Sequence, residues 1–461
     1  MSYKTRTILF IIFITLFLIS TPLVLLYATG YKINLTWPLK INTAIQKTGA
    51  FHIDSRPAGA FLFINDKVEQ KFINKYLLFN NEGLIRTPAK IKNLTPGEHD
   101  IRLELDGYWP WQKKLNIEPG QTTFAENIIL FKKELPLLLK NTPLLGVKIS
   151  PNNKYLGLIS DNLYILDAEN EVTIASFDIS EELLSSKQKQ EIEWSPNSQE
   201  IIFGNKIFDI INENKLLELT QIVGTDIFNI QWSQKDDSNV YFQNKNSLNK
   251  YNIINKKQEI IIKADKIIDY FTKDDNLIFI TETNNTQKLK IYSLLDKKII
   301  SELELPFSNY YKFINHNNKF VNLYNEKHEI LYLIDPFTSI NPLREIVNNL
   351  KYSYWINEDK LFYANNFEIW ILDLASNQKK LITRISYPIN GILWHSSNNY
   401  IIYGTSENIN IIELDSREKR NITEIINLEN INYINMDKNN EALYFNAKIG
   451  NQEGLYKMNI Q

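Results

Sequence analysis

The chain has 461 residues, a length that accommodates two or three domains. Its 51 basic and 53 acidic residues leave a net charge of -2, so its charge gives no indication of a nucleic-acid partner. It contains no cysteine, which excludes disulfides, zinc–thiolate sites, iron–sulfur clusters, a cysteine nucleophile and a lipid-modified N-terminal cysteine.

Residues 7–29 form an apolar segment of 23 residues without a charged side chain. A helix rises about 1.5 Å per residue, so a segment of this length spans a hydrocarbon core of about 30 Å. Lys4 and Arg6 precede the segment, and the positive-inside tendency places residues 1–6 in the cytoplasm. The sequence therefore predicts a single-pass membrane anchor, followed by a juxtamembrane segment over 30–45 and an extracytoplasmic remainder.

A cleaved signal peptide is the alternative interpretation of this segment. Signal peptides have an apolar core of about 7–15 residues and small residues before the cleavage site. The apolar run here is longer, and Leu26-Tyr27-Ala28 is a poor cleavage site, although Pro22 would break a shorter apolar core. In both interpretations the rest of the chain is exported.

Alternating apolar and polar residues, separated by turn residues, predict a small β-domain over 46–132. Phe51 and Ile53 alternate with polar neighbours, 57–59 (Pro-Ala-Gly) provides a turn, and 60–64 forms a second strand, so this pair is predicted to be a β-hairpin. Further apolar segments are expected at 91–94, 99–105 and 114–117, with turns at 95–98 and 106–108.

The order of short motifs in this region resembles that of the PEGA domain, a small β-sandwich-like module. The stretch that gives the family its name corresponds to Pro57-Ala58-Gly59-Ala60, with alanine in place of glutamate at a turn position. The other motifs correspond to Thr87-Pro88, Leu94-Thr95-Pro96-Gly97-Glu98-His99 and Gly107-Tyr108. The resemblance implies an extracytoplasmic, envelope-associated accessory module that has no catalytic residues.

Two tryptophans flank a proline in the sequence Trp109-Pro110-Trp111. An exposed pair of this kind would stack on a carbohydrate. The alternative is a wide turn with one tryptophan buried beneath the sheet, and we favour this alternative.

From about residue 144 a pattern recurs in which a strand ends in a large residue, a polar turn follows, and a second apolar strand begins. The clearest copy is 191–203, EIEWSPNSQEIIF. The residues that end the first strands are Ile149, Trp194, Trp232, Phe271, Phe313, Trp355, Trp394 and Met436. Successive positions are 38–45 residues apart, and such a period with several short strands per unit is typical of β-propeller blades.

Eight such positions predict a β-propeller of eight four-stranded blades over 133–461. Seven blades are the alternative, if the irregular unit around Phe313 is not a blade. In the last unit 455–460 fall in the third strand, so a fourth strand is missing and a sheet edge would be exposed. The apolar segment 134–140 (ELPLLLK) precedes the first unit, and we expect it to supply this outer strand and close the ring.

The turns at 149–152 (ISPN) and 194–197 (WSPN) resemble those of TolB-like propellers, and the repeat as a whole resembles TolB-like and WD-repeat-like propellers. Only these two turns keep Ser-Pro-Asn, so the resemblance implies an architecture and no particular activity. The large residues at the ends of the first strands are interpreted as core, because they fill the space between twisted sheets.

No motif in the sequence specifies a reaction. The five histidines are scattered over both predicted domains: His52, His99, His316, His328 and His395. His-Glu-x-x-His, Gly-x-Ser-x-Gly, glycine-rich phosphate loops and the sialidase-type Asp box are all absent. Acidic residues at Asp236-Asp237, Asp274-Asp275 and Asp437 are interpreted as solvated turn carboxylates in preference to calcium ligands. We predict no catalytic residue, metal ligand or cofactor, and the sequence singles out no binding residue.

These features favour a membrane-anchored, non-enzymatic binding or scaffolding protein of the cell envelope. Its membrane contact would be 7–29, and its propeller surface would bind an envelope protein or polysaccharide but no nucleic acid. The alternative function is a propeller-type glycan-processing enzyme with acidic residues at the central channel. A convergent polar cluster at that channel would favour the enzyme.

Overall fold

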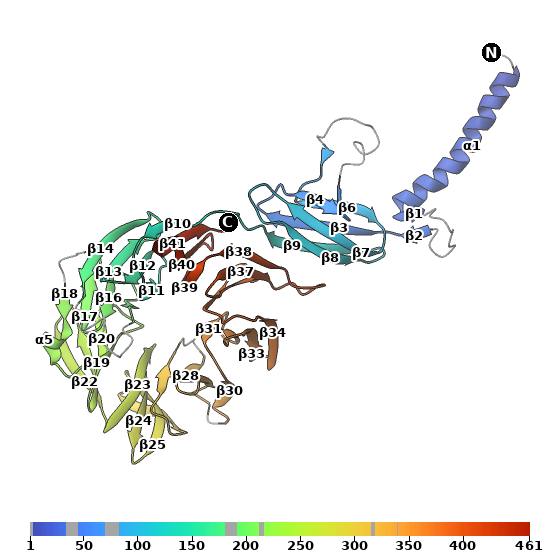
Figure 1. The fold of residues 1–461 in the computed structure, drawn as a ribbon. Coiled ribbons are helices and arrows are strands. Elements are labelled where there is room, and N and C mark those ends of the chain that lie inside the picture. Colours follow the sequence, from blue (N-terminus) through green and yellow to red (C-terminus); the bar gives the residue numbers. More distant parts are fainter. Residues whose placement is uncertain are drawn as a thin grey trace. The chain divides into compact units, whose positions relative to one another are not determined.

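The computed structural model describes residues 3–33, 45–69, 83–179, 191–211, 216–314, 319–338 and 340–461. Apart from one long and one short helix, the elements of these ranges are strands (Figure 1). The chain forms two compact units. The first unit contains 1–134 together with 412–423 and 460–461, and the second contains 135–411 and 424–459.

Helix α1 (Tyr3–Ala28) contains nearly all of the predicted anchor, and none of its residues is buried in the protein. It is the one helix among the described residues that is long and apolar enough to cross a membrane, a property that signal sequences share. The hydroxyl groups of Thr7 and Thr15 donate to backbone carbonyls four residues earlier, at 3.1 and 2.8 Å. These bonds satisfy the hydroxyls without water, as an apolar environment requires.

Most of the predicted juxtamembrane segment 30–45 lies outside the described residues. At its borders, β1 (Tyr31–Ile33) pairs with β2 (Ile45–Lys47) in a two-stranded sheet.

The remainder of the first unit is built on two sheets, of three strands (β6-β3-β9) and four strands (β5-β4-β7-β8). Their bounds are β3 (Gly49–Arg56), β4 (Phe61–Ile64), β5 (Lys67–Val68), β6 (Ala89–Leu94), β7 (Gly97–Glu104), β8 (Trp111–Ile117) and β9 (Thr122–Ile129). Strands β3 and β9 are parallel. Every second residue of β3, β7 and β8 is buried, and side chains from both sheets form one core. This is a β-sandwich, as the resemblance to the PEGA domain implied, and its strands show the alternation that predicted a β-domain.

The predicted hairpin between 51–56 and 60–64 is wrong, although both segments are strands. Strand β3 pairs with β6 and β9, whereas β4 pairs with β5 and β7 in the other sheet. The loop between them therefore crosses from one sheet to the other. Thr87 fixes this loop, because its Oγ1 accepts from the Ala60 N–H (3.1 Å) and lies 2.6 Å from Ser55 Oγ, which donates to the Pro57 carbonyl. Turn residues predict a change of direction but not the partner strand.

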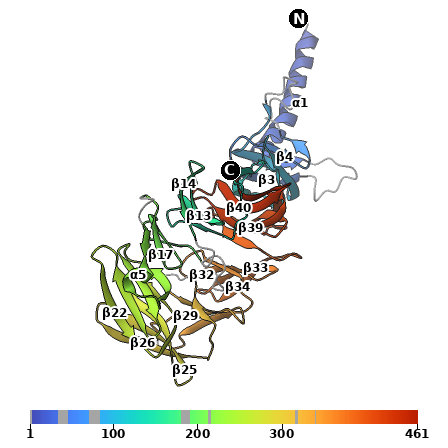
Figure 2. The same cartoon turned by 60° about the vertical axis from the view of Figure 1, so that its left-hand side comes forward.

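Residues 137–459 form eight four-stranded sheets within the described part of the chain (Figure 1, Figure 2). The first four sheets contain β11 (Gly146–Ile149), β12 (Tyr155–Ile159), β13 (Asn162–Asp167), β14 (Val172–Asp178); β15 (Glu193–Trp194), β16 (Glu200–Phe203), β17 (Lys206–Asp209), β18 (Leu216–Glu218); β19 (Phe228–Trp232), β20 (Asn239–Asn244), β21 (Ser247–Asn252), β22 (Lys257–Lys263); and β23 (Lys266–Lys273), β24 (Asn276–Thr283), β25 (Thr286–Ser293), β26 (Lys298–Leu305). Helix α5 (Leu219–Val223) follows β18.

The other four sheets contain β27 (Tyr311–Phe313), β28 (Val321–Asn325), β29 (Ile330–Ile334), β30 (Leu343–Val347); β31 (Tyr352–Trp355), β32 (Lys360–Ala364), β33 (Glu368–Asp373), β34 (Gln378–Arg384); β35 (Gly391–Trp394), β36 (Tyr400–Gly404), β37 (Asn408–Glu413), β38 (Ile422–Asn427); and β39 (Glu429–Met436), β40 (Ala442–Ile449), β41 (Gln452–Asn459), β10 (Leu137–Lys140). In the first seven sheets the strand order follows the chain. The irregular unit around Phe313 forms a complete four-stranded sheet.

The eighth sheet takes its outer strand from the segment before the first sheet. Strand β10 pairs antiparallel with β41, and Lys140 lies opposite Leu455. The first and eighth sheets also contact each other, because β11 lies against β39 and the Tyr444 hydroxyl donates to the Ala168 carbonyl at 2.8 Å. The two ends of this 323-residue stretch, Leu137 and Asn459, therefore belong to one sheet.

Each of the eight large residues that the sequence placed at the end of a first strand lies in the first strand of its own sheet. Trp194, Trp232 and Phe271 are buried, and the other five are half-buried. The Trp194 indole donates to the Lys148 carbonyl (3.1 Å), and the Trp232 indole donates to the Glu193 carbonyl (3.3 Å). Both carbonyls belong to the first strand of the preceding sheet. Trp194 and Trp232 are therefore buried and join neighbouring sheets, as their interpretation as core predicted.

Candidate functional site

The order of the strands divides the second unit into two faces. Successive strands in its sheets are antiparallel, so the turns between strands one and two and between strands three and four lie at one end of each sheet. We call this end the turn face. The turns between strands two and three, and the links from one sheet to the next, lie at the opposite end, which we call the connection face.

Exposed aromatic side chains occur on the connection face. They are Phe228, Phe307, Tyr310, Tyr352, Phe367 and Tyr387, with 36–58% of their surface accessible. Five of them belong to the neighbouring sheets between β26 and β35. Aromatic residues are enriched at the energetic centres of protein interfaces and also stack on sugars, because they bury a large area at little cost in side-chain entropy. These six connection-face aromatics are the candidate binding surface.

Two carboxyl groups on the first strands of their sheets have pKa values well above the usual range. Burial raises the pKa of Glu193 to about 7 and the pKa of Asp269 to about 6. Glu193 Oε1 accepts from the Trp232 N–H (2.8 Å), and Asp269 Oδ2 accepts from the Phe313 N–H (2.7 Å). Each carboxylate therefore bonds to the first strand of the next sheet. This structural role accounts for both acids without assigning them to catalysis.

These two carboxyls make the stability of the second unit depend on pH. A folded pKa raised above the unfolded value penalises folding at high pH; the penalty declines as pH falls below the folded pKa and is gone only below the unfolded pKa. Raising the Glu193 pKa from 4.5 to about 7 corresponds to roughly 3 kcal/mol at pH 8. We therefore expect the free energy of unfolding to rise between pH 8 and pH 6.5, and Glu193→Gln to raise it at pH 8 and to flatten this slope.

The measurement is urea unfolding followed by tryptophan fluorescence at pH 8.0 and 6.5. His395 opposes this rise slightly, because burial lowers its folded pKa to about 4 and the unfolded imidazole begins to take up a proton near pH 6.5. This contribution is the same in the parent chain and in Glu193→Gln, so it cancels in their comparison. Glu407→Gln is the control, since Glu407 is exposed and lies in the second unit on another sheet, in the turn between β36 and β37. Equal slopes for the parent chain and Glu193→Gln would contradict this assignment.

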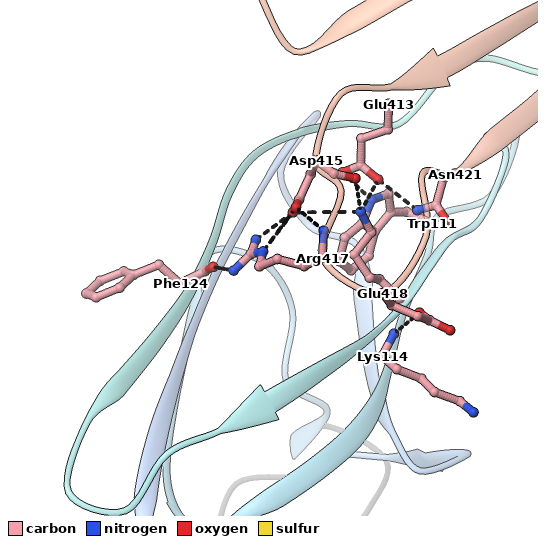
Figure 3. A network of polar contacts seen from close by, with 9 residues as sticks. Trp111, Lys114, Phe124, Glu413, Asp415, Arg417, Glu418 and Asn421 are labelled. Carbon is pink, nitrogen blue, oxygen red and sulfur yellow. Dashed lines mark hydrogen bonds and ion pairs between the residues drawn. The ribbon is translucent and has the colours of Figure 1, made fainter. Parts of the chain in front are cut away.

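A second polar cluster lies in the first unit, where 412–423 contact β8 (Figure 3). The Lys113 side chain has no accessible surface, and its Nζ lies 2.8 Å from Glu413 Oε2 and 3.7 Å from Asp415 Oδ2. Lys113 also donates to the Asp415 carbonyl at 2.8 Å. The Trp111 indole donates to Glu413 Oε1 at 3.1 Å. The buried ammonium is thus compensated by two carboxylates and a carbonyl.

The edge of this cluster is tied by further bonds to backbone groups. Arg417 bonds to the Asp415 carboxylate at 2.7 Å and donates to the Phe124 carbonyl at 2.7 Å (Figure 3). Glu418 Oε2 accepts from the Lys114 N–H at 2.7 Å. The charged groups of Lys113, Glu413, Asp415 and Arg417 pair with one another, so we interpret the cluster as structural and not as a ligand site.

The prediction that one tryptophan of the Trp109-Pro110-Trp111 pair is buried beneath the sheet is confirmed for Trp111. Trp111 is buried in the core of the first unit, with its indole bonded to Glu413. Trp109 is half-buried, and Lys133 Nζ lies 4.9 Å from its ring centroid. The pair therefore does not present two open faces to a sugar.

The histidines that the structure describes occupy separate environments. His99, the last residue of the Leu-x-Pro-Gly-x-His motif, is buried; its Nε2 donates to the Thr95 carbonyl (2.7 Å) and its Nδ1 accepts from the Asn65 side-chain amide (3.0 Å). His395 is buried in a turn with Ser397. His316 lies outside the described residues.

Four of the five turn carboxylates considered as calcium ligands bond to protein groups. Asp236 accepts from the Ser238 N–H, Asp237 from the Asn197 N–H, and Asp437 from the Ala442 N–H; Asp275 pairs with Lys235. Over the ranges that the structure describes, no group of three His, Cys, Asp or Glu side chains is arranged to hold a metal ion.

The Lys113 cluster was missed by sequence reasoning, yet a signal was present. Lys113 alternates with Trp111 and Leu115, and all three are buried on the same face of β8. A lysine in the apolar register of a strand requires buried acceptors. The identity of those acceptors was not predictable, because Glu413 and Asp415 are about 300 positions away in the chain.

Comparison with known families identifies residues 77–128 as a match to the PEGA domain. The match lies inside the predicted range 46–132, and its first residues, 77–82, lie outside the described part of the chain. The Pro57–Ala60 stretch precedes it. No curated protein matches the sequence.

Solved structures similar to this chain include β-propellers. A eukaryotic initiation factor has 12% identity and a TM-score of 0.49, covering 69% of this chain and 85% of that chain. The C-terminal WD40 domain of Sif2 has 12% identity and a TM-score of 0.48, covering 71% and 97%. The Dos1 propeller has 13% identity and a TM-score of 0.48, covering 72% and 96%. Identities this low concern the fold alone.

Proposed function

We propose that this chain, in which a PEGA domain and a β-propeller occur together, is a membrane-anchored, extracytoplasmic binding or scaffolding protein of the cell envelope. The apolar helix α1, with Lys4 and Arg6 in its first turn, supports an anchor whose N-terminus is cytoplasmic. The PEGA domain supports an extracytoplasmic location, since the family resemblance implies an envelope-associated module.

The eight sheets of the second unit are, in this proposal, the eight blades of one closed propeller. Two observations support closure: the pairing of β10 with β41, and the contact between the first strands β11 and β39. Closure through a shared sheet removes an exposed edge that would otherwise pair with other chains. A closed ring also gives a rigid platform for the loops on its two faces.

The observation that carries the function is the set of six connection-face aromatics. Their partner is an envelope protein or polysaccharide, and nothing in the charge of the chain favours a nucleic acid. The chain is proposed to act without catalysis, because Glu193 and Asp269 are bonded to backbone N–H groups of neighbouring strands. Turnover of envelope glycans by the purified chain would contradict this part of the proposal.

Replacing two of these aromatics is expected to weaken partner binding without loss of fold. Phe367 and Tyr387 lie on either side of β33 and β34, and both are exposed. Central interface aromatics contribute about 2 kcal/mol each, so Phe367→Ala with Tyr387→Ala should weaken binding by at least about tenfold. The measurement is co-purification of envelope components with the detergent-extracted full chain.

The matched control is Leu381→Ala, which removes an exposed apolar side chain from the fourth strand of the same sheet. The control should retain its partner. Equal recovery from the double variant and the control would contradict the assignment of the connection face.

A further inference from the structure

Four consecutive sheets carry an exposed, large apolar residue at the same position of the turn between strands three and four. These residues are Ile211, Ile254, Leu295 and Phe337, and 59–75% of their surface is accessible. Each is the second residue after the Asp, Asn or Ser at the end of strand three. We call them the turn-face tips. The first and sixth sheets have Glu169 and Ala375 at this position, so the apolar series is confined to the second to fifth sheets.

The fourth strands that follow these turns extend the apolar surface. Exposed aliphatic residues on them are Leu216, Ile260, Ile299, Ile300, Leu343 and Ile346. These residues lie on β18, β22, β26 and β30, the outer strands of the same four sheets. Val172, Leu381 and Ile422 are exposed on the fourth strands of other sheets, so the tips are what distinguishes these four sheets. Protruding apolar side chains grouped on one face mark a candidate site of association.

The charges around the tips indicate what kind of partner fits. The turns 253–257 and 294–298 carry four exposed lysines at positions 256, 257, 297 and 298, against a single acid, Asp296. Asp296 accepts from the Ser293 hydroxyl at 3.2 Å, so it is turned toward its own turn. Lys297 Nζ also lies 4.0 Å from Glu259 Oε1, so two acids stand against these four lysines. The tips Ile254 and Leu295 therefore combine protruding aliphatic groups with a local excess of positive charge.

This combination matches the headgroup region of an anionic bilayer. Aliphatic side chains insert at the boundary between headgroups and acyl chains, and each nearby lysine contributes about 1 kcal/mol of attraction to anionic lipid. The tips themselves offer no hydrogen-bonding group, which suits a fluid partner better than a protein or a glycan. The lysines provide the charge complementarity that such a surface requires.

We propose that the turn-face tips of the second to fifth sheets dock on an anionic lipid surface. This goes beyond the proposed function, which assigns a polymer partner to the connection face. It rests on that function in one respect: an anchor at α1 would tether the chain to a membrane. Docking would then give the protein a second, reversible membrane contact in addition to α1.

The absence of cysteine allows single reporter positions to be introduced into the full chain. Ile254→Cys and Leu295→Cys, each labelled with the environment-sensitive fluorophore NBD, are reconstituted into vesicles of phosphatidylcholine and phosphatidylglycerol that contain spin-labelled lipid. Glu169→Cys and Ala375→Cys are the matched controls, at the same turn position of other sheets. All four positions are exposed, so the labels are not expected to disturb the core.

The proposal predicts blue-shifted emission at 254 and 295 and at least twofold stronger quenching by the spin-labelled lipid than at 169 and 375. The difference should disappear in vesicles of phosphatidylcholine alone. Equal quenching at all four positions would overturn the proposal. A blue shift at 254 and 295 that grows with protein concentration, without stronger quenching by the spin-labelled lipid, would also overturn it. That result would indicate contact with a second copy of the chain.

Carbonate extraction of the same vesicles distinguishes failure of the α1 anchor from failure of docking by the tips. If the chain is released by carbonate, membrane anchorage by α1 is wrong, whereas the tips are still tested by adding vesicles to the released protein. Lipid quenching at 254 and 295 on those vesicles would support the tips independently of α1.

Discussion

Lys113→Met is expected to destabilise the first unit by about 3–5 kcal/mol, because it removes the cation from a buried charge cluster and leaves a carboxylate uncompensated. Glu413, the nearest acid, keeps only 7% of its side chain accessible and has no route to solvent without moving. Its remaining bonds, from the Trp111 indole and the Asn421 amide, are weaker than the lost ion pair. Denaturant unfolding together with hydrogen exchange of the β7 and β8 amides measures the loss.

Lys114→Met is the matched control for this substitution. The two lysines are adjacent on β8, but the Lys114 side chain is exposed and only its backbone N–H takes part in the cluster. The control should change stability by less than about 0.5 kcal/mol. If both substitutions cost the same, the cluster does not stabilise the first unit in the way described here.

A double-mutant cycle separates the ion pair from simple loss of packing. Glu413→Gln keeps the shape of the side chain and removes its charge. If Lys113 and Glu413 act as a pair, the double variant should cost less than the sum of the single variants by about 0.5–3 kcal/mol. Additive costs would indicate that Lys113 acts through its alkyl chain alone.

Gly454→Ala is the second substitution with a large expected effect, because it tests the strand that joins the two ends of the second unit. A Cβ at this position would lie 1.9 Å from the Lys140 carbonyl oxygen and 3.0 Å from the Thr142 backbone nitrogen. Both atoms belong to backbone that β41 meets on its outer side. We expect β10 to separate from β41, at a cost of about 3 kcal/mol or more.

Thermal unfolding and limited proteolysis around 134–145 measure this effect. Gly391→Ala is the control, since its Cβ would lie 3.7 Å from the nearest atom of Ile434, which is ordinary contact. Gly454→Ala should lower the unfolding temperature and make β10 cleavable, whereas Gly391→Ala should do neither. In a chain that lacks 135–140, the same Gly454→Ala change should have little further effect, because the clashing carbonyl is gone.

The fold was largely predictable because its signals repeat along the chain. Alternation of period two identified the strands of the first unit, and the spacing of Trp194 and its equivalents identified the sheets of the second. The pairing of strands in the first unit was less predictable. Pro57 to Gly59 read as a hairpin turn, yet these residues carry the chain between two sheets, since nothing local to them specifies Thr87 as the group that fixes the loop.

The candidate binding surface was not predictable residue by residue. Tyr387 and Phe367 are exposed, whereas Phe362 and Tyr363 of the same sheet are buried, and composition alone does not separate the two classes. Position explains the difference in exposure, because Tyr387 and Phe367 lie in connections whereas Phe362 and Tyr363 lie in β32. Strand alternation predicts which side chains face a core, but connections have no such period.

Photo-crosslinking in intact membranes tests the central claim, binding through the connection face, most directly. The full chain carries a photoreactive benzoylphenylalanine at 367 or 387 on the connection face, or at 375 on the turn face. Binding through the connection face predicts one discrete crosslinked envelope component at both 367 and 387 and none at 375. Crosslinks of equal yield at all three positions, or none at 367 and 387, would contradict it.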